Sequence, residues 1–214
     1  MLSLPLFVVA ALELWAAWHL PWWLGWFAAW AGASTAFVGL AYLFGRPGWL
    51  GKTHAARAFL WPYLAFARSV AAGAQRIGLV ERQEVVPGLW VGGWPRRGAP
   101  GLAQLDLTAE LPRRGDAAAY AAIPMLDGAV PDRATYDAAV ACALAWRAAG
   151  TPVLVHCAFG HGRSVAVVIA VLVIEGHAPD ADAALALVTR IRPRARMTPA
   201  QRAFVRRVVG PPPG

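Results

Sequence analysis

An apolar run, a glycine-rich turn and a second apolar run follow one another between Pro152 and Gly176. The first run, PVLVH, is short and continuous, which is typical of a strand buried on both faces. The second run, SVAVVIAVLVIEG, has only ten residues between Ser164 and Glu175, too few to cross a membrane. We therefore expect a buried strand, a tight turn and a buried core helix, the unit from which α/β proteins are built.

Further short strands and helices are expected from about Glu84 onward. EVVPGLWVGG alternates like a strand that ends in a glycine turn, LAQLDLTAE is a second strand candidate, and AAIPMLD is short and extended. Helical patterns cover Arg133 to Ala149 and Asp180 to Ile191. A last helix opens with TPAQ, in which Thr198 and Gln201 form a capping box. The terminal PPPG is expected to be disordered.

The first 44 residues resemble membrane-embedded sequence. Leu4 to Leu20 contains Glu13, whereas the 23 residues from Trp22 to Phe44 carry no charge. Since a bilayer core needs about 20 helical residues, the second segment spans comfortably and the first barely. Tryptophans cluster around the break between the segments, as interfacial aromatics do. We expect a transmembrane hairpin of two helices over residues 1–45, with Glu13 protonated, packed on the partner helix, or part of a re-entrant segment.

We expect residues 46–82 to form a basic, aromatic connector ahead of a second domain at residues 83–210. Arginines alternate with large apolar side chains, and Pro62 should kink any helix here. The connector is either a helix lying in the headgroup plane or a third helix buried against its neighbours. Its positive charge predicts that the domain after it faces the cytoplasm, so the protein would be a multi-pass membrane protein.

Charge and cysteine content narrow the possible partners. The chain carries a net charge of +8, and seven arginines without an acid lie between Arg190 and Arg207, so an anionic partner is favoured. These arginines are either a solvated face or a membrane-docking patch. Two cysteines, Cys142 and Cys157, give no disulfide framework and no zinc pattern, so we expect reduced thiols and neither a metal nor another cofactor. No stacking platform accompanies the basic tail, and no nucleic-acid partner is expected.

The turn between the two apolar runs, VHCAFGHGRS, carries the chemistry. Cys157 follows the strand, and Arg163 and Ser164 open the helix, so loop amides and the positive end of the helix dipole converge on one point. Such a point favours a thiolate over a thiol and also binds phosphate oxygens. Gly160 and Gly162 allow the backbone to curl around an anion.

HCAFGHGRS resembles the HCxxGxxRS signature of the protein tyrosine phosphatase superfamily. VVPGLWVGG, AAIPMLD and TPAQRAFVRRV are similar to the first strand, the general-acid segment and the closing helix of its dual-specificity branch. The resemblance covers about Val85 to Val209. It implies an α/β fold, a protein-tyrosine-phosphatase-like three-layer sandwich with a central mixed sheet, here preceded by the N-terminal transmembrane helices.

The resemblance also implies a role for each residue of the motif. Cys157 would attack phosphorus and form a phosphocysteine, and Arg163 would hold the phosphoryl oxygens. Ser164 would donate a hydrogen bond to the departing sulfur, and His156 would order the loop. Asp127 would be the general acid, with Asp132 as the alternative. The phosphate-binding loop would consist of Ala158, Phe159, Gly160, His161, Gly162 and Arg163.

Two departures from the family pattern bear on function. The region from Trp94 to Ala103 is short for the branch, so the usual first helix is expected to be truncated. Ala158 and Phe159 replace basic residues found in relatives that act on inositol polyphosphates, which leaves His161 as the only extra potential cation of the loop. A phosphorylated protein or a monophosphorylated phospholipid therefore fits best as substrate.

Two other functions remain open. The first is a non-catalytic phosphate-binding membrane module on the same scaffold, although binding alone needs neither the nucleophile nor the acid. The second is a rhodanese-like sulfurtransferase, whose loops are commonly one residue shorter before the arginine than the five-residue spacing between Cys157 and Arg163.

Overall fold

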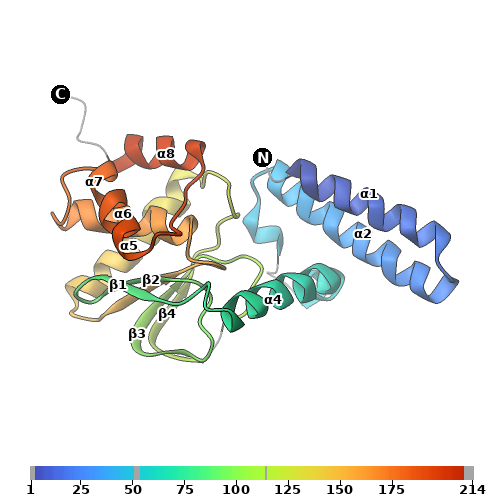
Figure 1. The fold of residues 1–214 in the computed structure, drawn as a ribbon, viewed down its shortest axis with the longest axis horizontal. Coiled ribbons are helices and arrows are strands. Elements are labelled where there is room, and N and C mark those ends of the chain that lie inside the picture. The colour runs from blue at the N-terminus through green and yellow to red at the C-terminus, as the bar shows by residue number, and fades with distance from the viewer. Residues whose placement is uncertain (1–2, 51–53, 114, 210–214) are drawn as a thin grey trace. The chain divides into compact units, whose positions relative to one another are not determined.

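The computed structural model describes residues 3–50, 54–113 and 115–209, and the proline-rich tail lies outside these ranges. The chain forms two compact units (Figure 1). One runs to Val70 and includes residues 109–111, and the other comprises residues 71–108 and the chain from Pro112 onward. The boundary falls within a helix of the connector.

The first unit is built on two antiparallel helices, α1 (Ser3–His19) and α2 (Trp22–Leu43), joined at Pro21. Glycines of α2 permit their close approach (Figure 1). A Cβ at Gly25 would lie 2.7 Å from the carbonyl oxygen of Ala17, and one at Gly32 would lie 2.7 Å from the Leu14 side chain. By length and composition, α2 is the one helix of the described ranges long and apolar enough to cross a membrane. At 17 residues, α1 spans only about 26 Å.

Glu13 of α1 is partly buried in this unit. A cavity of about 350 Å³ opens beside it, lined by Phe27 and Thr35 of α2 and by Tyr63 and Phe66. Among the described residues, no hydrogen-bond donor reaches its buried Oε2 atom.

The connector is helical but broken. It contains the 3₁₀ turn η1 (Pro47–Leu50), α3 (His54–Phe59) and α4 (Trp61–Arg76), with the break at Leu60. Pro62 lies in the first turn of α4, where its missing N–H leaves no helical hydrogen bond unmade. Pro62 therefore begins a helix rather than kinking one, and the expected kink is replaced by two helices.

A five-stranded mixed sheet is the centre of the second unit. The strands are β1 (Gln83–Val86), β2 (Leu89–Gly92), β3 (Gly98–Asp106), β4 (Asp116–Ala122) and β5 (Val153–His156), in the order β1-β2-β5-β3-β4. Only β1 is antiparallel to its neighbour. The expectation of one strand over EVVPGLWVGG is wrong in detail, because Pro87 and Gly88 turn the chain and divide it into β1 and β2. Gly88 takes the positive φ of 77° that the turn requires.

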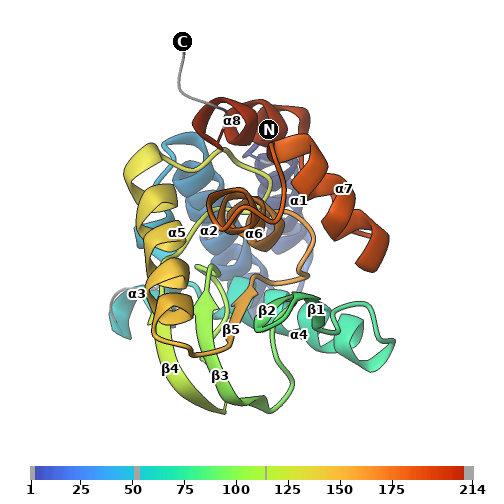
Figure 2. The same cartoon turned by 90° about the vertical axis from the view of Figure 1, so that its left-hand side faces the viewer.

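Four helices pack on one face of this sheet (Figure 2): α5 (Arg133–Ala148), α6 (Arg163–Ile174), α7 (Ala181–Ile191) and α8 (Pro199–Val209). Their positions confirm the helices expected from the sequence, including the core helix α6. Thr198 and Gln201 form the predicted capping box, with mutual backbone-to-side-chain hydrogen bonds of 3.0 and 3.2 Å. Val153 and Val155 of β5 join this core. Leu154, pointing the other way along the strand, faces the opposite side of the sheet.

The connection from β2 to β3 crosses that opposite side. It consists of residues 93–97 and contains no helix, which agrees with the truncation expected from the short sequence. Trp94 in this connection is buried, and its indole donates to the carbonyl of Pro112 at 2.8 Å. The last turn of α4 is attached here, since Gln75 donates to the carbonyl of Trp94 at 2.6 Å.

Candidate active site

Cys157 follows β5 directly, and the loop after it returns to the start of α6 at Arg163. The Cys157 side chain is buried. Its Sγ atom accepts a hydrogen bond from the Gly160 amide at 3.2 Å and lies 3.5 Å from the hydroxyl of Ser164. These two contacts hold the sulfur at the base of the loop, with a backbone N–H directed at it.

The carbonyl groups of the loop all point outward. Ala158 accepts from the Trp94 amide at 3.1 Å, and His161 accepts from the Arg196 amide at 2.7 Å. Between them, Phe159 and Gly160 accept from the Arg192 guanidinium at 2.8 and 2.7 Å. In a trans peptide the next N–H points away from the carbonyl, so the amides of residues 159–162 face the inside of the loop. Four inward amides beside the sulfur form an anion-binding nest.

Only glycine fits at position 160. Its φ is +73°, and a Cβ there would lie 2.3 Å from the carbonyl carbon of Gly92. Side-chain residues rarely adopt this φ, and a contact this short would displace the backbone of β2. The loop can therefore close against β2 only because position 160 has no side chain.

Arg163 is almost completely buried beneath the loop, at 2% exposure. Its Nη1 atom donates to the carbonyl of Met125 at 2.9 Å and to that of Leu107 at 3.3 Å. These two bonds fix the plane of the guanidinium. Its Nε atom lies 3.2 Å from a carboxylate oxygen of Asp127, whose side chain is 44% exposed.

The two candidate acids occupy different environments. Asp127 reaches the site from the segment after β4, which Gln201 secures with a 2.9 Å hydrogen bond to the carbonyl of Ala129. Asp132 caps α5 instead, accepting from the amide and the hydroxyl of Thr135 at 2.9 and 2.6 Å. These hydrogen bonds hold the pKa of the Asp132 carboxyl below its usual value. Asp127 is thus the carboxylate that lies at the loop, whereas Asp132 is the N-cap of α5.

His156 lies buried behind Cys157, and Asp106 lies beside His156. The two residues are paired in register on β5 and β3, with 3.8 Å between the His156 Nδ1 atom and the Asp106 carboxylate. Asp106 also accepts from the amide and hydroxyl of Thr108 and from the hydroxyl of Tyr120 at 2.7 to 2.8 Å. Burial lowers the pKa of His156, against the opposing effect of Asp106, so the imidazole is neutral near pH 7.

Arg192 and Asp106 were not identified from the sequence. Arg192 is 4% exposed and forms four hydrogen bonds. Two hold the loop, and two reach the start of β1, at the carbonyl of Glu81 (2.6 Å) and the side chain of Gln83 (2.9 Å). The sequence offered only weak signals for these two residues. Asp106 is a polar residue within a candidate strand, and Arg192 is one of seven arginines between Arg190 and Arg207.

The remaining loop side chains line the rim. Phe159 and His161 are half-buried, with stacked rings 6.2 Å apart. Burial and the nearby charges of Arg192 and Arg194 lower the pKa of His161. The extra cation considered for this loop is therefore absent near pH 7. Cys142 lies on α5, and burial raises the pKa of its thiol, so it is a poor nucleophile.

This arrangement can bind a tetrahedral oxyanion over a sulfur nucleophile. Inward amides and one guanidinium supply donors for its oxygens, and one carboxylate lies at the rim. Within the described ranges, no group of three or more histidine, cysteine, aspartate or glutamate side chains could hold a metal ion. The reactive groups at hand are the thiol, the arginine and the carboxylate.

The chain resembles known phosphatases. Residues 104–209 match the family model described as "Swiss Army Knife protein, DSP-PTPase phosphatase domain". Among solved structures, a mouse putative dual specificity phosphatase complexed with zinc tungstate aligns with a TM-score of 0.52 and 24% identity, over 60% of this chain and 87% of its own. A point variant of human DUSP28 aligns with a TM-score of 0.53 and 24% identity, over 60% and 95%. A comparison with curated proteins found no match.

A third solved structure, PTPMT1 in complex with PI(5)P, aligns with a TM-score of 0.50 and 19% identity, over 60% of this chain and 94% of its own. The second unit is therefore a dual-specificity-phosphatase-like domain with the α/β fold of the protein tyrosine phosphatases and a central mixed sheet.

Proposed function

We propose that the chain is a membrane-tethered, cysteine-dependent phosphatase of the dual-specificity branch, which hydrolyses phosphomonoesters through a phosphocysteine intermediate. The observation that carries this proposal is the surroundings of the Cys157 sulfur. Loop amides point toward it, Arg163 is fixed beneath the loop, and Asp127 lies at its rim. A site for binding alone would need neither the nucleophile nor the acid.

In the first step the Cys157 thiolate attacks phosphorus and the bond from phosphorus to the ester oxygen breaks. The protonated carboxyl of Asp127 donates its proton to the departing alkoxide. Arg163 and the loop amides stabilise the charge on the phosphoryl oxygens. Substrate phosphate competes with Asp127 for the Nε atom of Arg163, and this competition would release the carboxyl toward the leaving group.

In the second step a water molecule attacks phosphorus and the phosphorus–sulfur bond breaks. The Asp127 carboxylate takes the proton from this water, so the acid is restored for the next cycle. Ser164, 3.5 Å from the sulfur, donates a hydrogen bond to the thiolate as it leaves. His156 acts as a positioning residue, because its neutral ring lies buried behind the loop and does not face the substrate.

A phosphoprotein or a monophosphorylated phospholipid is the proposed substrate. The loop positions 158 and 159 carry alanine and phenylalanine, and neutral His161 adds no charge, so the site has one guanidinium for one phosphate. Tethering raises the local concentration of substrates at the bilayer surface. The PI(5)P in the PTPMT1 structure makes a monophosphorylated phosphoinositide a reasonable compound to test.

We further propose that α1 and α2 both cross the membrane and that the catalytic domain faces the cytoplasm. The uncharged α2 and the exposed tryptophans near Pro21 support insertion. The basic connector after Phe44 supports the orientation. The proposed parts of the chain are the hairpin at residues 1–45, the connector at 46–82 and the catalytic domain at 83–210.

Purified full-length protein in detergent should hydrolyse p-nitrophenyl phosphate, and Cys157→Ser should abolish this turnover. Cys142→Ser is the matched control and should retain it. Activity that survives Cys157→Ser would falsify the cysteine mechanism, while a folded native protein that binds phosphate without turnover would support a binding module.

A substrate panel then separates the substrate classes. It comprises phosphotyrosine and phosphothreonine peptides, phosphatidylglycerophosphate and phosphoinositides in vesicles. Thiosulfate with cyanide tests the sulfurtransferase alternative. Preferred turnover of one phosphomonoester class identifies the substrate, and thiocyanate formation without phosphatase activity would contradict the proposal.

A further inference from the structure

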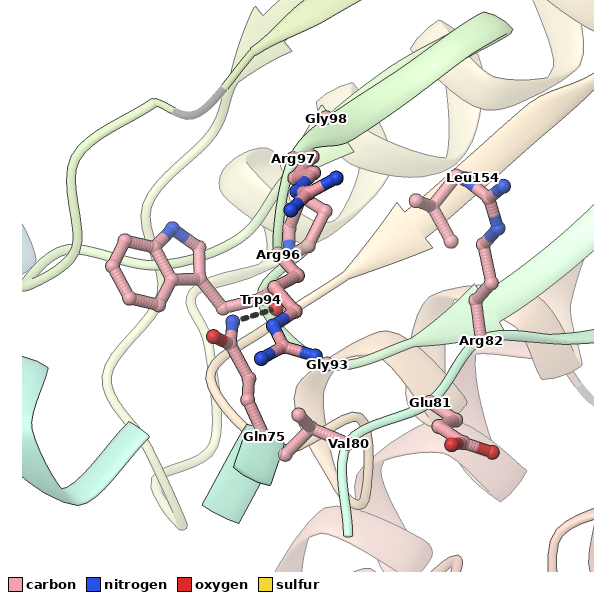
Figure 3. A pocket seen from close by; sticks show the side chains of 11 residues that line it. Gln75, Val80, Glu81, Arg82, Gly93, Trp94, Arg96, Arg97, Gly98 and Leu154 are labelled. Atoms are coloured by element: carbon pink, nitrogen blue, oxygen red, sulfur yellow. Dashed lines mark hydrogen bonds between the residues drawn. The ribbon is translucent and has the colours of Figure 1, made fainter. Parts of the chain in front are cut away.

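A cavity of about 620 Å³ lies on the face of the sheet opposite α5–α8. It opens where the short connection from β2 to β3, residues 93–97, crosses the sheet. Leu154 of β5 contributes to its lining, together with Gly93 and Trp94 of the connection and Gln75 of α4 (Figure 3). The cavity thus lies outside the catalytic loop and is lined by none of residues 157–163.

Positive charge dominates the lining of this cavity. Arg82, Arg96 and Arg97 contribute three guanidinium groups, against the single carboxylate of Glu81. In the view of Figure 3, the guanidinium groups of Arg82 and Arg97 lie on either side of Leu154. Neither Arg82 nor Arg97 forms an ion pair with a carboxylate in the part of the chain that the structure describes. Two fork-shaped donors remain available to an anion.

The walls of the cavity are held in place. Trp94 is 1% exposed and is fixed by its indole bond to Pro112 and by the Gln75 bond to its carbonyl. Gly93 lets the connection pass close to its neighbours, because a Cβ there would lie 2.5 Å from the Val80 side chain and 2.9 Å from the carbonyl oxygen of Ala158. The guanidinium of Arg82 lies 5.8 Å over the ring of Trp90, which limits its freedom. A frame this well fixed lowers the entropic cost of binding.

We propose that this cavity is a second, non-catalytic site for a phosphate group, carried by a phosphate monoester or by a phospholipid headgroup. Arg82 and Arg97 bind the phosphate oxygens, and the rest of the volume holds the group attached to the phosphate, since one water occupies only about 30 Å³. Among the described residues, the lining contains no cysteine or histidine, so the site binds and does not hydrolyse.

The site goes beyond the proposed phosphatase reaction and is also connected to it. The Trp94 amide donates to the carbonyl of Ala158, the first loop residue after the nucleophile. An occupant that contacts residues 93–97 therefore touches the segment that holds one edge of the catalytic loop.

The test counts phosphate sites on the full chain in detergent by equilibrium dialysis with labelled inorganic phosphate. The native chain should bind two phosphates and Arg82→Gln/Arg97→Gln only one, because the affinity of the cavity falls at least about tenfold when two charged donors are removed. The matched control, Arg190→Gln/Arg202→Gln, removes two exposed arginines of α7 and α8 and should still bind two. All these variants replace exposed side chains, so they should fold.

Turnover of p-nitrophenyl phosphate separates this proposal from the proposed function. Arg82→Gln/Arg97→Gln should keep native turnover while losing one phosphate. If the native chain lacks turnover but the same variant still loses one phosphate, the cavity site stands and the phosphatase fails. An Arg82→Gln/Arg97→Gln variant that binds as many phosphates as the native chain overturns the cavity site.

Competition identifies the source of the phosphate. Glycerol 3-phosphate and dioctanoyl phosphatidic acid are each titrated against phosphate bound in the cavity. Equal displacement by both supports a soluble monoester, and stronger displacement by the phosphatidic acid supports a lipid headgroup. Failure of both compounds to displace the phosphate overturns the proposal.

Discussion

Replacing Arg192 by methionine removes the four hydrogen bonds with which this side chain joins the loop to the start of β1. A hydrogen bond to a charged group contributes about 1.5–3 kcal/mol to the free energy of unfolding. The two bonds from Arg192 to the carbonyls of Phe159 and Gly160 therefore contribute about 3–6 kcal/mol together. Because Arg192 is only 4% exposed, few water molecules could take the place of its donors in the variant. Arg192→Lys keeps the positive charge but loses the planar, fork-shaped arrangement of donors. We expect it to lower the free energy of unfolding by about half as much as Arg192→Met, and we use it for the activity measurements.

The effect on activity follows from the geometry of the loop. Without the two outward donors, the carbonyls of residues 159 and 160 no longer fix the direction of the amides that follow them. A displacement of catalytic groups by about 1 Å can cost about 100-fold in rate, and we expect a fall of that size in kcat/KM for p-nitrophenyl phosphate with Arg192→Lys. Arg194→Lys, two positions along the chain and exposed, is the matched control.

A second readout separates loop positioning from general destabilisation. The rate at which iodoacetamide alkylates Cys157 reports how reactive its sulfur is in the folded loop, provided that Cys142 is replaced by alanine. We expect slower alkylation in Arg192→Lys at a temperature where the variant remains folded. A folded variant with native alkylation and native turnover would refute the reasoning, because the loop would then hold its shape without Arg192.

Three further predictions concern the acid, the buried histidine and the glycine of the loop. Asp127→Asn should lower kcat about 100-fold or more for phosphopeptides and less for p-nitrophenyl phosphate, whose leaving group needs less protonation; equal losses would place the acid elsewhere. Because burial lowers the pKa of His156, only the unfolded chain binds its proton just below pH about 6.5. The contribution of His156 to the free energy of unfolding should therefore be full above that pH and decrease as the pH falls below it. His156→Gln should make the melting temperature depend less on pH in this range; an unchanged dependence would show that other groups cause it. Gly160→Ala should abolish phosphate binding at the catalytic loop and so lower the number of bound phosphates by one, because its Cβ would lie 2.3 Å from the backbone of Gly92 at a φ of +73°; an unchanged number of bound phosphates would show that the loop tolerates a side chain.

Elements with a strong local signal were predictable from the sequence. The buried run before Cys157 became β5, the apolar run after it became α6, and the capping box opened α8 as expected. These elements combine periodicity, length and end signals, which all depend on neighbouring residues. The turn at Pro87 and Gly88 carried a local signal as well, and the prediction of one continuous strand overlooked it.

Elements that depend on distant partners were not predictable. β4 begins at Asp116 with alanines, which have low strand propensity, and it forms because β3 offers a parallel neighbour. Asp106 became a candidate only when the register of β3 and β5 placed it beside His156. In the sequence, Arg192 cannot be distinguished from the exposed arginines near it. Only the path of the chain after α7 places its guanidinium against the outward carbonyls of the loop.

The loop shows why a short motif predicts chemistry better than geometry. Its ten residues include a thiol, glycines and an arginine. The hydrogen bonds that hold its carbonyls outward are donated by residues in segments before and after it, namely Trp94, Arg192 and Arg196. None of these donors is in place until β2, β5 and the chain after α7 have assembled. The inward amides thus exist only in the folded domain, and the orientation of the anion site depends on the whole second unit. A substitution far from Cys157 in sequence can therefore disable the site while every residue of the motif is intact.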